Sequence, residues 1–318
     1  MKTIIVALLT LFFLRAPVVA ADKIRIGVPD FTAQFGSRPL GQKLGFFQAE
    51  GLQAEIIRMN AVVGLTALVS GEIDYYTVIS PAVAAAIQGA PIRLVACTVA
   101  SAPFALIARP EFKSVPELRN KTIGLNTYGG NIEIVARLIF KRFGLDPDKE
   151  IKFLALGVSE HRFAAMKQGL AAATLGSPPL DFYGQRMGFV VLTRAHELFS
   201  YPASGVVASV KKIKEKADEV KRVIKAGIRT NRYFLQNRGG TIQAMAELMK
   251  IDKETATATY DSALKAFSDD GSMPEDGLRL IIEETKKQAK VNREVSLSEV
   301  ADLSILREAQ REMGITGR

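Results

Sequence analysis

The sequence contains no tryptophan, one cysteine (Cys97) and two histidines (His161 and His196) in 318 residues. A single cysteine excludes a disulfide within the chain. Cysteine and histidine are the usual ligands of zinc, and here they occur at no ligand-like spacing, so we expect no metal site and no cofactor. Cys97 lies in the apolar run 93–99, and nothing nearby would lower its pKa. This pattern predicts a buried, inert thiol, and we expect no catalytic residues.

Long apolar runs are missing from all of the chain except its start. Residues 4–14 are apolar apart from Thr10, follow Lys2, and precede small residues at positions 18–21. This pattern is typical of a cleavable signal peptide over residues 1–21, and the run is short for a membrane span. We therefore expect an exported, periplasmic protein. The residues near the cleavage point include no cysteine, so we do not expect a lipid anchor.

Acidic residues are fewer than basic ones, 33 against 42, which gives a net charge of +9. Removing Lys2 and Arg15 with the signal lowers it by two. The excess favours an anionic ligand, but the basic residues are interleaved with acids and aromatics are sparse, so we expect no nucleic-acid partner. The amphipathic segment 211–232 could bind a membrane as a basic helix. Its acids Glu215, Asp218 and Glu219 favour a solvated helix face instead.

Apolar runs of strand length alternate with helical patterns through the first two thirds of the chain, which predicts βαβ units and mainly parallel sheets. A first block has expected strands at 24–28, 53–59, 73–79 and 92–99. A further strand is expected at 104–108, and a middle block has its own expected strands at 122–125, 151–156, 171–175 and 188–192. Residues 205–210 then return the chain to the first block, and the remainder is helical.

Residues 122–143 combine a strand, a glycine-bearing turn and a helix. Apolar residues recur at helical spacing from Ile132 to Phe143, after the polar turn 126–131. The free amides and dipole of a helix N-terminus attract anionic or strongly polar groups. The turn is therefore either an ordinary capped connection or a ligand-binding loop.

Four segments, in this order and spacing, resemble the periplasmic solute-binding proteins of ABC importers, in the nitrate/sulfonate/taurine and thiamine-precursor branch (the SsuA/THI5-like, NMT1-like group). They are KLGFFQAEGL at 43–52, ALVSGEID at 67–74, LRNKTIG at 118–124 and FSDDGSMP at 267–274. The resemblance covers essentially all of the chain after the signal.

The resemblance implies a two-lobed type II periplasmic-binding-protein fold. Each lobe would be a mainly parallel sheet flanked by helices, and two crossing segments would form a hinge. We expect the crossings near 109–111 and 205–207. Lobe 1 would then comprise residues 22–109 and 207–318, and lobe 2 residues 110–206.

Ligands of open α/β sheets lie beyond the carboxyl ends of the strands, and the resemblance implies the same loops. The position of the turn 126–131 among these loops favours ligand binding by the turn. Asn126, Thr127 and the backbone amides of Gly129–Asn131 would contact the ligand's most polar or anionic group. The expected ligand-binding residues are Phe31, Thr32, Gln34, Asn60, Gly64, Ser80, Pro81, Ser101, Asn126, Thr127, Tyr128, Gly129, Gly130, Asn131, Ser159, Arg162, Ser177 and Tyr201.

The identity of the ligand stays open at this point. The resemblance implies either a small anion, such as a sulfonate or nitrate, or a flat heteroaromatic ring that would stack on Phe31, Tyr128 or Tyr201. Arg162 either pairs with an anion or is a solvated helix residue. The expected partners are a small-molecule ligand, an ABC permease and, indirectly, its ATPase, and we expect a monomer.

Two alternatives to an importer remain. One is a sensor that presents the bound lobes to a membrane receptor. The other is an enzyme on the same fold, like the pyrimidine synthases of this superfamily, which use a cysteine cluster and histidines for iron. The chain has neither that cluster nor a nucleophile elbow or phosphate loop, which disfavours an enzyme.

Overall fold

The computed structural model describes residues 21–315. Apart from Ala21, the expected signal peptide lies outside this range. The first of two five-stranded sheets has the order β2-β1-β3-β10-β4. β1 is parallel to β2 and β3, whereas β10 is antiparallel to β3 and β4. Its strands are β1 (Asp22–Val28), β2 (Leu52–Arg58), β3 (Tyr75–Val78), β4 (Ile92–Val99) and β10 (Ser204–Ser209).

The second sheet has the order β7-β6-β8-β5-β9. β6 is parallel to β7 and β8, and β5 is antiparallel to β8 and β9. In each sheet four strands therefore point the same way, and the fifth is the strand that enters from the other sheet. The strands are β5 (Ala105–Ala108), β6 (Thr122–Leu125), β7 (Lys152–Ala155), β8 (Ala173–Gly176) and β9 (Val190–Arg194).

The chain crosses between the sheets through residues 100–104 and 195–203, which join β4 to β5 and β9 to β10. These positions correct the expected crossings at 109–111 and 205–207. Residues 105–108 pair with β8 and β9, not with the first sheet. A four-residue apolar run carries no local sign of which sheet it joins, because its partners lie far along the chain.

The helices that cover the first sheet come from two parts of the chain, one before β5 and one after β10. α9 illustrates the pattern, since its Val220, Val223, Ile224 and Ile228 are buried against β-strand residues in one apolar cluster. The apolar face of segment 211–232, considered above for membrane binding, is therefore covered by the first sheet. The helices are α1 (Ser37–Lys43), α2 (Phe46–Ala49), α3 (Ala61–Ser70), α4 (Ile79–Ile87), α8 (Val210–Glu215), α9 (Ala217–Gln236), α10 (Arg238–Met249), α11 (Lys253–Ala263), α12 (Glu275–Ala289), α13 (Leu297–Val300) and α14 (Ser304–Glu312), with the 3-10 turn η3 (Leu264–Ala266).

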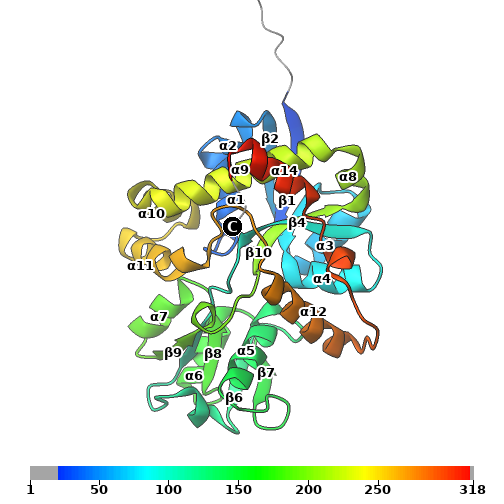
Figure 1. Cartoon of the computed structure of the whole chain (residues 1–318). Helices are drawn as coiled ribbons and strands as arrows, with labels where there is room; N and C mark the ends of the chain where they lie inside the picture. Colours follow the sequence, from blue (N-terminus) through cyan, green and yellow to red (C-terminus); the bar gives the residue numbers. More distant parts are fainter. Residues whose placement is uncertain (1–20, 316–318) are drawn as a thin grey trace, which may run out of the picture.

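Three helices flank the second sheet, namely α5 (Asn131–Arg142), α6 (Ser159–Lys167) and α7 (Leu180–Arg186), with the 3-10 turns η1 (Val115–Leu118) and η2 (Ala195–Glu197). The expected strand–turn–helix at 122–143 is present as β6 and α5, whose Val135, Ile139 and Phe140 are fully buried. Figure 1 shows two lobes, with α11 and α12 of the C-terminal region lying beside the second one. Between residues 21 and 315, no helix is long and apolar enough to cross a membrane.

Candidate functional site

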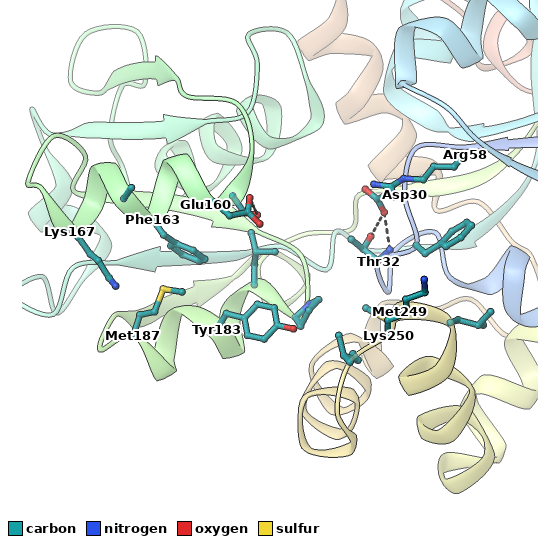
Figure 2. Close-up of a pocket in the computed structure, with 17 residues that line it drawn as sticks. Asp30, Thr32, Arg58, Glu160, Phe163, Lys167, Tyr183, Met187, Met249 and Lys250 are labelled. Carbon is teal, nitrogen blue, oxygen red and sulfur yellow. Dashed lines mark hydrogen bonds between the residues drawn. The ribbon is translucent and has the colours of Figure 1, made fainter.

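A cavity of about 710 Å³ lies between the two lobes, a volume in the range of small-molecule sites. The first lobe contributes the turn after β1 (30–32), Arg58 at the end of β2, and the turn between α10 and α11 (248–251). The second lobe contributes one face of α6 and the region of α7 from Pro179 to Met187. Figure 2 shows side chains of both lobes facing the space between them.

Local hydrogen bonds fix the turn after β1. The Asp30 carboxylate accepts bonds from the Thr32 backbone N–H at 2.9 Å and from the Thr32 hydroxyl at 2.6 Å. Such a bond from an aspartate to the backbone two residues on is a recurrent turn element. It presents Phe31 and Thr32 to the cavity, at the carboxyl end of a strand.

The wall on the second lobe is largely apolar. Phe163 of α6 is 5% exposed and stacks on Phe189 with ring centroids 5.7 Å apart. A Cβ atom at Gly184 would lie 2.9 Å from Ile107 and 3.5 Å from the Phe163 ring, so glycine lets α7 pack closely there. Tyr183 and Met187 lie on the cavity side of α7, and Met187 is half exposed.

The α10–α11 turn supplies the remaining side of the cavity. Lys250 ends α10 in the left-handed region, with a φ of 55°. A non-glycine residue adopts that conformation uncommonly. Here it reverses the chain so that Leu248, Met249 and Ile251 all line the cavity beside the lysine.

Within residues 21–315, the basic side chains around the cavity lack partners, whereas the acidic ones accept hydrogen bonds. The side chains of Arg58, Lys167 and Lys250 have no ion pair or hydrogen bond with any part of the described chain. The acids differ, since Asp30 accepts the two bonds described above and Glu160 accepts one from Ser159 at 3.0 Å. Hydrogen bonds from its own backbone N–H and from the Ser159 hydroxyl hold the pKa of Glu160 below its usual value.

Of the expected ligand-binding residues, Phe31, Thr32 and Ser159 line this cavity. Pro81, Ser101 and Ser177 are half-buried and do not line it. Asn60 caps α3 by accepting a 2.9 Å bond from the Val62 N–H.

The expected loop 126–131 is exposed from Asn126 to Gly129 and does not line the cavity. The Gly129 N–H donates to the Glu133 carboxylate at 2.7 Å, and the Tyr128 hydroxyl to the Phe153 carbonyl at 3.2 Å. An acid of the same helix therefore occupies one of the amides that we expected to bind ligand. Gly130 and Asn131 are half-buried, and within the described residues the buried Asn131 Oδ1 has no partner.

Four expected residues lie inside the first lobe. Gln34 donates to the Ala203 carbonyl at 3.1 Å, and the hydroxyls of Ser80 and Tyr201 lie 2.7 Å apart. Gly64 is packed so closely that a Cβ would lie 2.8 Å from Tyr76. The expected stacking role of Tyr201 is corrected, because its ring is 0% exposed and serves packing.

Arg162 does not line the cavity, and of its two expected roles that of a solvated helix residue is wrong. It is 5% exposed and so is no solvated helix residue. Its Nη1 donates to the Thr174 hydroxyl at 3.0 Å and to the Leu175 carbonyl, which ties α6 to β8. Burial lowers the pKa of Arg162 to about 10.

Most of the cavity wall was not predicted from the sequence. Phe163, Tyr183 and Met187 lie on helices, where an apolar residue at helical spacing is read as core. The turn 248–251 lies in the helical C-terminal region, far along the chain from the strand ends where ligand-binding loops were expected. Two of the missed residues had a sequence signal, since Arg58 lies at the carboxyl end of the expected strand 53–59 and Asp30 follows the expected strand 24–28.

A metal centre has no support in the described chain, since no group of three or more His, Cys, Asp or Glu in residues 21–315 could hold one.

The two sheets with a single reversed strand each, and a cavity between them, define a periplasmic-binding-protein fold of type II. The family model described as NMT1/THI5 like matches residues 34–238, and the chain belongs to this family. No sequence among the curated proteins matches it.

Solved structures share the fold at low sequence identity. The periplasmic nitrate-binding protein NrtA from Synechocystis PCC 6803 has a TM-score of 0.77 and 13% identity, covering 93% of this chain and 90% of that one. A periplasmic sulfonate-binding protein SsuA from Methylobacillus flagellatus KT has 0.76 and 15%, covering 94% and 96%. The aliphatic sulphonate-binding protein SsuA from Escherichia coli has 0.72 and 16%, covering 88% and 92%.

Proposed function

We propose that this protein is a periplasmic solute-binding protein that captures a small organic solute between its lobes and delivers it to an ABC importer. The observation that carries the proposal is the cavity of about 710 Å³ lined by residues of both lobes. A solute held there would contact both bodies, so its binding energy could favour their approach. The sulfonate- and nitrate-binding proteins that share the fold support the same role.

In this proposal the lobes move as bodies about the crossings 100–104 and 195–203, which replace the earlier expected hinge positions. Residues 1–21 direct export and are removed, and the mature protein is a monomer. The mass of the exported protein tests the leader, since an intact Met1 would contradict it. Light scattering during size-exclusion chromatography measures the oligomeric state.

The experiment for solute capture is a thermal-shift screen of the exported protein against sulfonates, nitrate, aromatic acids and pyrimidines, followed by calorimetry. Small-angle scattering with and without the solute then measures closure. We expect a 1:1 complex with a smaller radius of gyration. A panel without any binder would count against the proposal, and an altered solute after incubation would indicate an enzyme.

Uptake of the identified solute separates an importer component from a sensor. A strain lacking this protein should lose accumulation of the labelled solute and regain it on complementation. Normal uptake in that strain, with a lost transcriptional response to the solute, would favour the sensor.

A further inference from the structure

The cavity between the lobes is dominated by apolar side chains. Phe163, Tyr183 and Met187 face it from the second lobe, and Phe31, Met249 and Ile251 from the first. Burying such surface against a ligand's apolar groups is favourable. A hydrated inorganic anion offers no apolar surface in exchange, so this wall suits a ligand with a hydrocarbon or aromatic body.

The same cavity holds positive charge without protein partners. Arg58, Lys167 and Lys250 are unpaired in the described chain, whereas Asp30 and Glu160 already accept hydrogen bonds from neighbours. Figure 2 shows Arg58 and Lys250 on the same side as Thr32, and Lys167 beside Met187 at the far side. An anionic group can therefore be bound on the first-lobe side without displacing an existing ion pair.

We infer that the solute is an amphiphilic organic anion whose two parts are divided between the lobes. Its apolar body packs on Phe163, Tyr183 and Met187 of α6 and α7. Its carboxylate or sulfonate pairs with Arg58 and Lys250 across the cavity. The inference rests on the proposed function and names the solute class for the same site.

This division discriminates among the ligands that the sequence left open. A nitrate-like ion would satisfy the cations but leave the apolar wall in water. A neutral pyrimidine would cover the wall but leave the cations unpaired. Only a ligand with both parts uses both features, and because its ends contact different lobes, both parts contribute to closure.

The first test compares probes that differ in one part at a time, by calorimetry at low salt. Naphthalene-2-sulfonate and naphthalene-2-carboxylate carry both parts, naphthalene-2-sulfonamide lacks the charge, and methanesulfonate, sulfate and nitrate lack the apolar body. We expect the first two to bind, and each of the others to bind at least about tenfold more weakly, which corresponds to losing one strong contact. Added salt should weaken binding of the anions.

The second test uses variants with matched controls. Arg58→Gln should weaken naphthalene-2-sulfonate binding about tenfold and reduce the preference over the sulfonamide. Arg142→Gln is its control, because Arg142 of α5 is exposed, lies outside the cavity and has no ion pair or hydrogen bond within residues 21–315. Met187→Ser should weaken binding of both naphthalene compounds at least about fivefold. Leu170→Ser, at a leucine that is 60% exposed and outside the cavity, is its control.

The side chains of Arg58, Arg142, Met187 and Leu170 are exposed or half exposed, so melting curves should show that the four variants fold. The inference is overturned if nitrate or a neutral solute binds more tightly than the naphthalene anions. It is equally overturned if Arg58→Gln and Met187→Ser match their controls. The proposed function would survive either result. It fails if no solute binds, if the solute is chemically altered on incubation, or if a strain lacking the protein takes up the solute normally.

Discussion

At the scale of single residues, two arginines are buried, although charged side chains usually lie at the surface. Arg38 and Arg162 are 2% and 5% exposed, and burial lowers the pKa of each to about 10. Carbonyl and hydroxyl oxygens satisfy them in part, since Arg38 donates to the Gly205 carbonyl and Arg162 to Leu175 and Thr174. Within residues 21–315, the buried Arg38 Nη1 and Arg162 Nε have no partner. A buried charge is costly unless it is hydrogen-bonded, so the bonds that are present offset only part of that cost.

His196 gives the molecule a predictable pH dependence. Burial lowers its pKa below the ordinary 6.5, and within residues 21–315 its buried Nδ1 has no partner. The unfolded chain therefore binds a proton at a pH where the folded chain does not, so stability falls as the pH drops below about 6.5. In urea titrations from pH 8 to pH 5, we expect His196→Gln to lose part of this dependence.

The matched control for that measurement is His161→Gln. His161 is exposed on α6, so His161→Gln removes a histidine without changing the surroundings of the buried His196 Nδ1. Equal slopes for His196→Gln and the unmodified protein would contradict the role assigned to burial.

At the scale of the element, the β6–α5 turn separates two glycines that look equivalent in the sequence. Gly129 has a φ of 73°, in the left-handed region, whereas Gly130 has a φ of −88° and begins α5 as its cap. Only Gly129 adopts a conformation that costs an L-residue about 1 kcal/mol or more. Gly130 is limited instead by space, because a Cβ there would lie 3.1 Å from the Thr127 methyl.

We predict that Gly129→Ala lowers the free energy of unfolding by about 1 kcal/mol. Gly130→Ala should cost less, because the Thr127 side chain is exposed and can move by a few tenths of an ångström. Denaturant titrations of the two variants measure the difference. A larger loss for Gly130→Ala would show that crowding, and not the left-handed backbone, dominates this turn.

The sequence predicted elements whose signals are local. The alternation of strands and helices, the helix behind Asn131 and the buried Cys97 were all evident from apolar spacing, and Cys97 is 0% exposed. It did not predict that β5 joins the second sheet, because its pairing with Ala173–Gly176 is long-range. Nor did it predict the cavity wall at Phe163 and Tyr183, since a helix face looks the same whether it meets a core or a ligand.

At the scale of the whole molecule, a buried cluster ties the second lobe to α11. The Asp181 carboxylate is 3% exposed and accepts bonds from Arg194 and from Ser262 of α11, each at 2.6 Å. Asp181 lies on α7 between Leu180 and Tyr183. Those two residues line the cavity, so the same helix contacts the cavity and the C-terminal region.

We predict that Asp181→Asn lowers the free energy of unfolding by about 1.5–3 kcal/mol, because Arg194 and Ser262 lose a charged acceptor in a buried position. Asp148→Asn is the control, since Asp148 pairs with Arg137 while 75% exposed and should change stability little. Chemical denaturation measures both. A loss at Asp148 equal to that at Asp181 would contradict the weight given to burial.

The placement of β10 has a consequence for the order in which the chain folds. All strands of the second sheet lie within residues 105–194, whereas β10 at 204–209 completes the first sheet by inserting between β3 and β4. Pairing across such a separation forms slowly, because a long loop must close first. The second lobe can therefore fold as a continuous unit while the first sheet still lacks β10, the strand between β3 and β4. During folding, the exposed edges of β3 and β4 are most open to aggregation in the interval before β10 pairs with them.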